Sequence, residues 1–292
     1  DGLHIDDFFY PDGLKADEKT WDDSKMYALY GGGKTLTQWR ESNINRVVKS
    51  LHDATHAANP DAIFGVSPAG RMELTTYLYA DPRQWIEEGS IDYLAPQIYW
   101  PHSHATAAFS KVLASWRSIA LCEGETKSVP MIIGLAPYRY GESGFENLSE
   151  FLDQVEDTRN ASYYTRGNIW FRATHIGASA MKNYIKSNIY KYPSLVPNLA
   201  IGSLFESSSI AAPTISIDGK SVKWDKVEGA ENYAVYELEK IKSYTSGAAD
   251  WRANLIITAG LNSYKGKSGK NYAVVAYKGK NISKISNVVY VE

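Results

Sequence analysis

Strand-like and helix-like segments alternate over the first 200 residues, and this alternation restricts the fold more than any other feature. Short runs rich in β-branched and aromatic residues predict strands, and apolar residues three or four apart predict the helices between them. Repeated βα units produce a parallel sheet covered by helices, either doubly wound or closed into a barrel. The predicted strands are residues 3–10, 62–68, 91–100, 129–138 and 167–176, and the predicted helices are residues 37–59, 82–88, 105–121, 146–160 and 178–190.

Two of these helices have recognisable ends. Thr37 is the predicted N-cap of the first, and Asn59-Pro60 stops it. Asp81 is the predicted N-cap of the second, with Pro82 at its first position and Gly89 just past its end. The apolar face of the first helix is predicted at Trp39, Val47, Val48, Leu51 and Ala54.

The pattern changes near residue 210. From there the sequence consists of short strand-like segments of alternating apolar and polar residues, with turns at Asp218-Gly219 and Glu228-Gly229. Trp224 is expected to be buried between the strands. About 80 residues of this kind predict a β-sandwich. We therefore expect one domain at 1–208 and a second at 211–292, joined by a linker at 207–214 with a boundary near 211.

Composition excludes several classes of protein. A net charge of −2 over 292 residues gives no basic field for nucleic acid, and Cys122, the single cysteine, allows no intrachain disulfide. No apolar run is long enough for a membrane span. No glycine-rich phosphate motif follows a predicted strand, so no nucleotide cofactor is expected. The 21 Tyr and 8 Trp suit a core, and they also suit platforms for sugar rings.

Polar and aromatic residues collect where the predicted strands end. In a parallel barrel the active-site groups lie at the carboxyl ends of the strands. The residues at these ends are Asp6, Asp7, Ser67, Gln97, Tyr99, Trp100, Tyr138, Arg139, Tyr140 and His175.

The doublet Asp6-Asp7 follows the first strand. Side chains alternate across a strand, so Leu3 and Ile5 are expected under the helices, and His4 and Asp6 are expected in the lumen. Asp7 would begin the following loop. One interpretation makes Asp6 a buried structural carboxylate and Asp7 a turn cap, and the other makes one of them an acid, base, nucleophile or substrate ligand.

Gln97 follows the same rule on the third strand. Leu94 and Ile98 are expected to face the helices, and Tyr93, Gln97 and Tyr99 are expected to face inward. A glutamine beside aromatic residues at a strand end is typical of a ligand for sugar hydroxyls. It can equally satisfy buried backbone groups, and the sequence leaves both interpretations open.

The segments DGLHIDDFFYP, FGVSP, YADPRQWIEEGSIDYLAPQIYW and YPSLVP together resemble the bacterial glycosyl-hydrolase-like family ten, over about residues 1 to 200. This is a TIM-barrel family distinct from the family ten xylanases. The resemblance implies that DGLHIDD lies on the fourth strand of a (β/α)₈ barrel. We therefore expect a fragment, the C-terminal part of a barrel from about strand four to strand eight, or a chain that associates with a second copy. Residues 211–292 resemble a fibronectin type III domain.

The resemblance implies a glycoside hydrolase, which usually needs two carboxyl groups. Xylanase-type barrels carry one catalytic Glu at the end of strand four and another at the end of strand seven. The resemblance makes IIGLAPYRYGES the seventh-strand segment, and it has no carboxylate before Glu142, so that pair of catalytic residues is not expected here. Asp6 and Asp7 are the predicted catalytic residues, with Glu73, in the loop after FGVSP, as the other candidate. His4, Ser67, Gln97, Tyr99, Trp100, Tyr138, Arg139 and His175 are the predicted substrate ligands.

Two pairs of histidines have spacings that a metal site could use. His52 and His56 are four apart on a helix, a spacing that can hold zinc, but no third ligand is evident and a solvated helix face is expected. His102 and His104, two residues apart, also lack an evident third ligand. We predict no metal and no cofactor.

The expected function is hydrolysis of a polysaccharide, with peptidoglycan glycan strands as one substrate class, in the cell envelope or outside a bacterial cell. The alternative is a glycan-binding protein that lacks a competent acid and base. The expected partner is a glycan, with no nucleic acid and no membrane span, and the fibronectin-like part is expected to act as a spacer.

Overall fold

The computed structural model describes residues 2–10, 22–121, 128–160, 165–196, 208–242 and 249–292. The chain divides into two compact units, formed mainly by Asp1–Ile189 and by Phe205–Glu292. The expected boundary near residue 211 stays a prediction, because part of the linker lies outside the described residues. Cys122 also lies outside them. None of the described helices is both long and apolar enough to cross a membrane.

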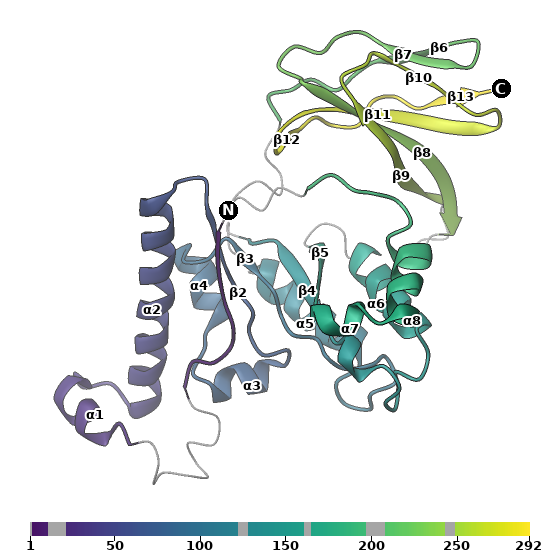
Figure 1. Cartoon of the computed structure of the whole chain (residues 1–292). Coiled ribbons are helices and arrows are strands. Elements are labelled where there is room, and N and C mark those ends of the chain that lie inside the picture. Colours follow the sequence, from purple (N-terminus) through teal and green to yellow (C-terminus); the bar gives the residue numbers. More distant parts are fainter. Residues whose placement is uncertain (1, 11–21, 122–127, 161–164, 197–207, 243–248) are drawn as a thin grey trace. The chain divides into compact units, whose positions relative to one another are not determined.

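The first unit is built on a parallel sheet with the strand order β1-β2-β3-β4-β5 (Figure 1). Every neighbouring pair in this sheet is parallel. The predicted mixed α/β fold with a parallel sheet is therefore confirmed. The strands are β1 (Gly2–Ile5), β2 (Ile63–Val66), β3 (Tyr93–Leu94), β4 (Met131–Leu135) and β5 (Thr165–Trp170).

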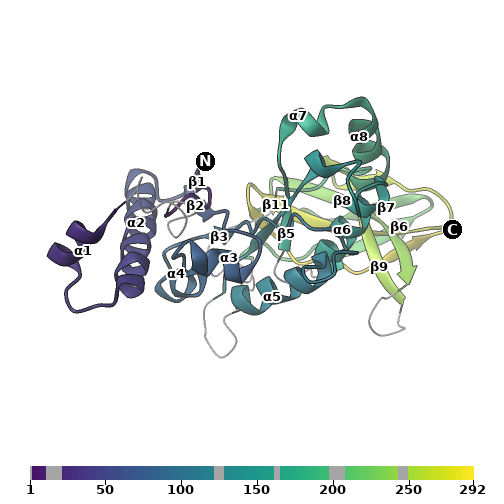
Figure 2. The same ribbon diagram turned by 90° about the horizontal axis from the view of Figure 1, so that it is seen from below.

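Each crossover between successive strands contains at least one helix. Figure 2 shows α2 toward the β1 end of the sheet and α6 toward the β5 end, in agreement with the contacts of α2 with β2 and of α6 with β5. The helices are α1 (Ser24–Tyr30), α2 (Leu36–Ala58), α3 (Met72–Tyr77), α4 (Pro82–Glu88), α5 (Phe109–Leu121), α6 (Ser149–Asn160), α7 (Ala173–Ile176) and α8 (Ser179–Tyr184). A 3₁₀ turn covers Pro137–Arg139, and a π-helical turn covers Ile185–Ile189.

The core of this unit lies between the sheet and its helices. Trp85 of α4 and Trp116 of α5 are fully buried, and so is Phe64 of β2. The two indole N–H groups do not go unpaired, because Trp85 donates to Asn45 Oδ1 (2.7 Å) and Trp116 donates to the Gly70 carbonyl (2.6 Å). These bonds remove the cost of burying a polar ring atom, so the tryptophans contribute their apolar area to the core.

The helix ends agree with the sequence at α4 and differ at α2. Gln84 N–H donates to Asp81 Oδ1 (3.1 Å), which confirms the predicted N-cap, and Gly89 follows the last residue of α4 as predicted, in a left-handed conformation. The N-cap of α2 is Thr35, which forms a reciprocal capping box with Gln38, so Thr37 was the wrong cap. Val47 is half exposed and was also wrongly placed in the core.

Strands are shorter than the apolar runs that predicted them. In the run 91–100 only Tyr93 and Leu94 form a regular ladder, since Pro96 has no N–H to donate. Gln97 then bridges to Ala69 and Gly134, which keeps it in line with the sheet. The first strand stops at Ile5, and the FFY segment is not strand.

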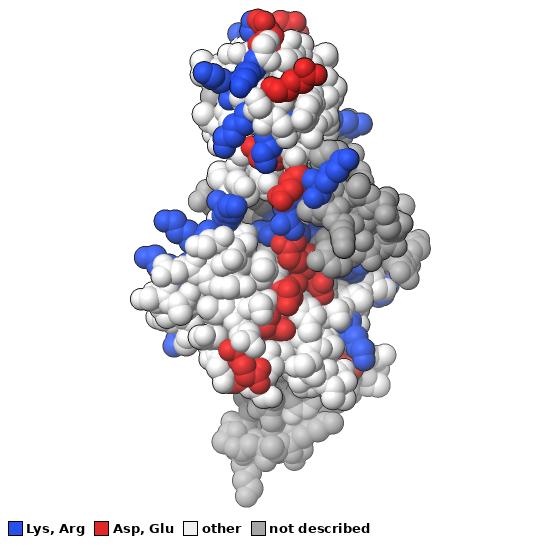
Figure 3. Space-filling view, turned by 90° about the vertical axis from the view of Figure 1, so that its right-hand side faces the viewer, with Lys and Arg blue, Asp and Glu red and all other residues white. Residues whose placement is uncertain are grey.

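Helix α6 carries a row of acidic side chains. Figure 3 shows acidic residues gathered in a strip on the side of the first unit that carries α6 in Figure 1. Burial raises the pKa of Asp153, and the charges of Glu150, Asp157 and Glu156 raise it further, while His102 opposes the shift. The acidic row is therefore close-packed, and the histidine is its counter-charge.

The second unit consists of antiparallel strands in two sheets. One sheet has the order β10-β7-β6, and the other has the order β12-β11-β8-β9 with β13 paired to β11. Trp224 is buried with Val222 and Tyr272 in one core, as the sequence led us to expect for the tryptophan. The strands are β6 (Ile215–Asp218), β7 (Ser221–Trp224), β8 (Asn232–Lys242), β9 (Ala249–Ala259), β10 (Ser263–Lys265), β11 (Lys270–Lys278), β12 (Asn281–Ile282) and β13 (Val289–Val291).

Candidate functional site

The aspartate doublet lies immediately after the carboxyl end of β1. The Ile5 carbonyl accepts from Ser67 N–H (2.9 Å), which keeps β1 and β2 paired up to the doublet. The Asp7 carbonyl then accepts from Phe9 N–H (2.9 Å), so the chain turns at Asp7. Asp7 N–H donates to Asp6 Oδ1 (2.9 Å). The two carboxyl groups therefore sit at the edge of the sheet where parallel α/β proteins carry their active sites.

Asp7, rather than Asp6, faces a pocket. Asp6 is exposed and Asp7 is half-buried, opposite to the expectation that Asp6 points inward and Asp7 lies in a solvated loop. The pocket has a volume of about 590 Å³ and lies between the segment after β1 and helix α3, which Figure 1 shows beside that end of the strand. It is lined by Asp7, Phe8, Phe9, Tyr10, Ala69, Leu74, Tyr77, Leu78 and Gln97.

Gln97 ties the doublet to the third strand. Its side-chain amide donates to Asp6 Oδ1 (2.6 Å) and to the Ser67 carbonyl (3.2 Å). Gly70 makes this position possible, because a Cβ at residue 70 would lie 1.9 Å from the Gln97 carbonyl oxygen. The backbone interpretation of Gln97 is met at the Ser67 carbonyl, and the same amide also binds the Asp6 carboxylate beside the pocket.

The surroundings of Asp7 weaken it as an acid. Burial raises the pKa of Asp7, and the charge of Asp6 and a hydrogen bond between the two side chains raise it further, while a hydrogen bond from Gln97 opposes the shift. Two carboxyl groups in contact cannot both ionise easily. Asp7 thus has the environment of a proton donor, with Asp6 as the carboxylate beside it.

Aromatic rings follow the carboxyl ends of the neighbouring strands. Tyr99 stacks on Phe171 (ring centroids 6.2 Å apart), and Tyr138 contacts Phe171 edge-on (6.2 Å) and His175 (6.1 Å). Tyr138 and Phe171 are 40% and 47% exposed, so their rings are accessible to a ligand. We call Tyr99, Tyr138, Phe171 and His175 the aromatic platform.

The platform lies near the doublet. Burial raises the pKa of Tyr99, and the charges of Asp6, Tyr138 and Asp7 contribute in the same direction. Sequence reasoning found three of the four platform residues and missed Phe171. The available signal was its place directly after Trp170, at the end of the last strand of the sheet.

His4 and Ser67 have partners inside the sheet. His4 Nδ1 lies 2.8 Å from the Tyr93 hydroxyl, with the two rings stacked, and partial burial of the ring lowers the pKa of His4. The Ser67 hydroxyl donates to the Ala95 carbonyl (2.7 Å). Both side chains therefore support the strand ends.

Trp100 and Arg139 are also occupied by the fold. Trp100 packs against the core of the first unit. Arg139 donates to the Tyr99 carbonyl (2.7 Å) and to Glu142 (2.8 Å). Arg139 thus holds the backbone beneath the platform, and its role as a direct substrate ligand stays a prediction.

Glu73 lies in the first turn of α3, on the surface. Its side chain is 74% exposed and pairs with Arg71 (3.4 Å), and it is not among the residues that line the pocket. A hydrogen bond from its own backbone, helped by Arg71, lowers the pKa of Glu73. These surroundings suit a permanently ionised surface carboxylate, so the geometry gives Glu73 no support as a proton donor.

A carboxyl pair and aromatic rings thus lie at the carboxyl edge of a parallel α/β sheet, the edge at which such folds carry their active sites. A family model described as glycosyl hydrolase-like 10 matches residues 1–152. The chain belongs to this family, as the sequence led us to expect.

Curated relatives agree with the family. The chain is 31% identical over 222 residues to glycosyl hydrolase YngK of Bacillus subtilis (strain 168), covering 68% of this chain and 42% of that protein. It is 32% identical over 158 residues to glycosyl hydrolase DigH of Escherichia coli (strain K12), covering 49% of this chain and 34% of that protein. The chain thus spans less than half the length of these relatives.

Among solved structures, the fibronectin type-III domain of human fibronectin type III domain containing protein 3 matches 30% of this chain and 87% of its own. The identity is 22% and the TM-score is 0.17. The second unit is therefore characterised by its own strands, and its likeness to fibronectin type III stays a prediction.

Proposed function

We propose that the first unit carries the acid group of a glycoside hydrolase, with Asp7 as proton donor and Asp6 as the carboxylate that orients its proton. The proposal is supported chiefly by the half-buried Asp7 carboxyl, which lines a pocket and has a raised pKa. Cleavage of a glycosidic bond needs a carboxylic acid that stays protonated near neutral pH and donates to the leaving oxygen. Burial beside a second carboxylate is one way to obtain such an acid.

The doublet acts as one acid in this proposal, because Asp7 N–H donates to Asp6 Oδ1 (2.9 Å) and the neighbouring Asp6 raises the pKa of Asp7. The paired carboxyl groups of glycosidases stand roughly 5 Å or more apart, so Asp6 and Asp7 together supply only one of the two. Asp7 is the only carboxylate among the described residues that line the pocket. The proposal therefore assigns the second carboxyl group to a residue outside the set that lines this pocket.

The aromatic platform is the proposed sugar-binding surface. Exposed rings bind the C–H faces of pyranoses, and Gln97 and the doublet offer hydrogen bonds to hydroxyl groups. A polysaccharide is the proposed substrate class, with peptidoglycan glycan strands tested first. Such a substrate would place the protein in the cell envelope or outside the cell.

A glycan-binding protein without catalysis is the second candidate. It is favoured by the lack of a second carboxylate among the described pocket residues. In that case the aromatic platform would bind a glycan chain, and the doublet would only accept hydrogen bonds from its hydroxyls.

The test uses the full-length protein with peptide-stripped peptidoglycan and a panel of polysaccharides, and it measures new reducing ends. Asp7→Asn is expected to lower the rate by about 10²–10⁴-fold, the usual contribution of a general acid. Asp6→Asn is expected to lower it as well, because the partner carboxylate is lost. Asp61→Asn, an exposed aspartate in the turn before β2, is the matched control and should keep full activity.

Melting temperature separates catalysis from folding. A raised pKa means that ionised Asp7 destabilises the fold, so Asp7→Asn should melt at the same or a higher temperature at neutral pH. The difference should vanish at low pH, where the wild-type carboxyl is protonated in both folded and unfolded states. Wild-type turnover in both variants would show that the doublet is not catalytic, and binding without cleavage by the wild type would favour the glycan-binding candidate.

A further inference from the structure

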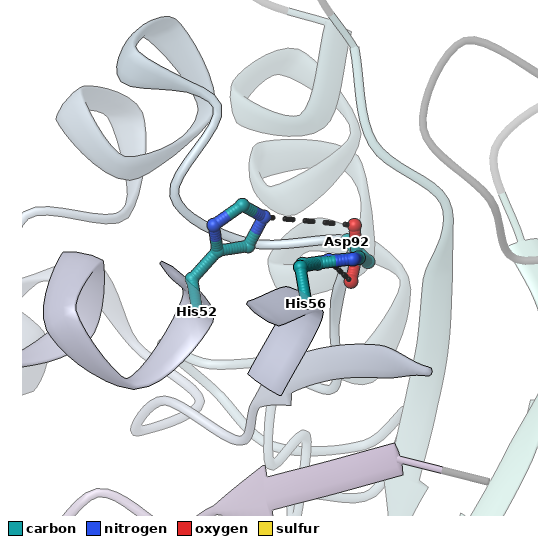
Figure 4. A group of neighbouring side chains, drawn as sticks. All are labelled: His52, His56 and Asp92. Carbon is teal, nitrogen blue, oxygen red and sulfur yellow. Dashed lines mark hydrogen bonds and ion pairs between the residues drawn. The ribbon is translucent and has the colours of Figure 1, made fainter. Parts of the chain in front are cut away.

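A second cluster of functional side chains lies at the other edge of the parallel sheet. His52 and His56 project from the last turns of α2, and Asp92 directly precedes β3 (Figure 4). One nitrogen of each histidine and one carboxylate oxygen of Asp92 lie within 4.8 Å of one another. The sequence pattern predicted a solvated helix face without a third ligand. That expectation is wrong, because the His52 side chain is only 15% exposed and Asp92 supplies the third group.

The Nε2 atoms of both rings point at Asp92. His56 Nε2 lies 2.9 Å from Asp92 Oδ2, and His52 Nε2 lies 3.9 Å from Asp92 Oδ1. The longer distance is beyond a hydrogen bond, and His52 Nε2 is buried with no hydrogen-bond partner in the part of the chain that the structure describes. A buried ring nitrogen without a partner, facing a carboxylate across a short gap, is in a favourable position for a metal ion between them.

The outer nitrogens of both rings also have partners. His52 Nδ1 lies 3.2 Å from Asp53 Oδ1, and His56 Nδ1 lies 3.4 Å from the Pro60 carbonyl. Histidines that bind metals nearly always donate their other ring N–H to a carboxylate or a backbone carbonyl, which fixes the ring and frees the opposite nitrogen. Both rings here meet that condition.

Asp92 is held in place by the sheet. Its Oδ2 accepts from Phe64 N–H (2.6 Å), and its own N–H donates to the Phe64 carbonyl (2.8 Å). The Asp92 side chain is 3% exposed. A buried carboxylate with two histidines and little solvent around it is an expensive arrangement unless a cation or a proton compensates its charge.

We propose that His52, His56 and Asp92 form a Zn²⁺ site that joins the end of α2 to the start of β3. Two imidazole nitrogens and one carboxylate oxygen match zinc and its late first-row neighbours better than Mg²⁺ or Ca²⁺, which prefer all-oxygen sites. A water molecule would complete four-coordination, since His56 remains 31% exposed. The site is independent of the proposed glycosidase chemistry.

The site's place in the fold assigns it a structural role. The last turns of α2 and the residue before β3 both lie at the amino edge of the sheet, whereas the doublet lies at the carboxyl edge. In parallel barrels the amino edge serves stability and the carboxyl edge serves catalysis. Bound zinc would fix α2 against β2 and β3, and so stiffen the wall of the unit that carries Asp6 and Asp7 at its other end.

The test adds Zn²⁺ alone to the chelator-treated full chain and measures bound metal after equilibrium dialysis. The wild type should hold one Zn²⁺ per chain, and its melting temperature should rise with free Zn²⁺. His52→Ala, His56→Ala and Asp92→Asn should each lose most of the bound metal and most of the zinc-dependent rise. His175→Ala removes a histidine of similar exposure outside the cluster and should bind zinc like the wild type.

Asp92→Asn also weakens the bonds to β2, so the decisive readout is the zinc-dependent change rather than the melting temperature itself. His52→Ala is the safest variant, because its Nε2 makes no hydrogen bond that the fold would lose. The proposal is overturned if the wild type holds no zinc after dialysis, or if His52→Ala and His56→Ala hold as much as the wild type. In the first case the cluster is held only by the hydrogen bond between His56 and Asp92, and in the second zinc binds elsewhere on the chain.

Discussion

Gln97 donates to Asp6 Oδ1 across 2.6 Å, although the two residues are 91 positions apart in the sequence. The bond passes over the end of β2, where the same amide also contacts the Ser67 carbonyl. It thus connects the ends of three neighbouring strands at the aspartate doublet. Because the hydrogen bond from Gln97 opposes the upward shift in the pKa of Asp7, this contact also limits how weak the acid becomes.

Replacing Gln97 by methionine should therefore raise the pKa of Asp7 further. An acid donor is active while it is protonated, so the high-pH limb of the activity profile should move to higher pH. Carboxyl-detected NMR titration measures the same shift in the absence of substrate. Gln84→Met removes amide hydrogen bonds on α4, away from the doublet, and should leave both measurements unchanged. A downward shift in Gln97→Met would show that the amide does not stabilise the ionised pair.

His102 links the segment after β3 to the acidic row of α6. Its ring nitrogens lie 2.9 Å from Glu150 and 3.0 Å from Asp157, and the hydrogen bonds to Asp157 and Glu150 raise the pKa of His102 from 6.5 to about 10. A raised histidine pKa stabilises the fold fully below the unfolded value of 6.5 and loses that effect as the pH rises through about 10.

His102→Gln should lower the free energy of unfolding by about 1–2 kcal/mol at pH 6, after allowance for solvent screening of a partly exposed pair. The difference from the wild type should shrink steadily toward pH 10.5. Urea denaturation at several pH values measures it, with His175→Gln as the control. A difference that does not change with pH would mean that packing, and not charge, is what the histidine contributes.

The Tyr93 ring lies so close to Gly65 that residue 65 has no room for a side chain. A Cβ at residue 65 would lie 2.1 Å from Tyr93 Cζ, and the Tyr93 hydroxyl lies 2.8 Å from His4 Nδ1, which limits how far the ring can move. Gly65→Ala should therefore destabilise the fold by roughly 1–3 kcal/mol through overpacking. Gly177→Ala is the matched control, because its nearest contact would be an ordinary 3.4 Å and its φ is already helical. Thermal unfolding of both variants tests this prediction. Equal melting temperatures for Gly65→Ala and Gly177→Ala would mean that the Tyr93 ring moves aside without a cost in stability.

The alternation of strands and helices was enough to predict the parallel sheet. The spacing of apolar residues distinguishes strands from helices, and a helix between two successive strands is typical of parallel pairing. The orientation of the doublet could not be obtained in the same way. The parity rule requires a continuing strand, but β1 stops at Ile5 and the turn closed by Phe9 N–H brings Asp7 to the pocket. Asp92 is 36 residues from His56, and a contact at that separation has no local pattern in the sequence.

Phe171 gives the sharpest test of the aromatic platform, because nothing but its position on the surface marks it as functional. Phe171 is 47% exposed and stacks on Tyr99, so Phe171→Ala removes a surface ring and leaves the core of the unit intact. We expect the KM for a polysaccharide, or the Kd in a binding assay, to rise about tenfold, equivalent to about 1.4 kcal/mol, with little change in kcat or melting temperature. Tyr30→Ala on α1, where the ring is 66% exposed, is the control and should bind glycan normally. If both variants bind like the wild type, the sugar does not contact these rings, and the pocket beside Asp7 must bind it without them.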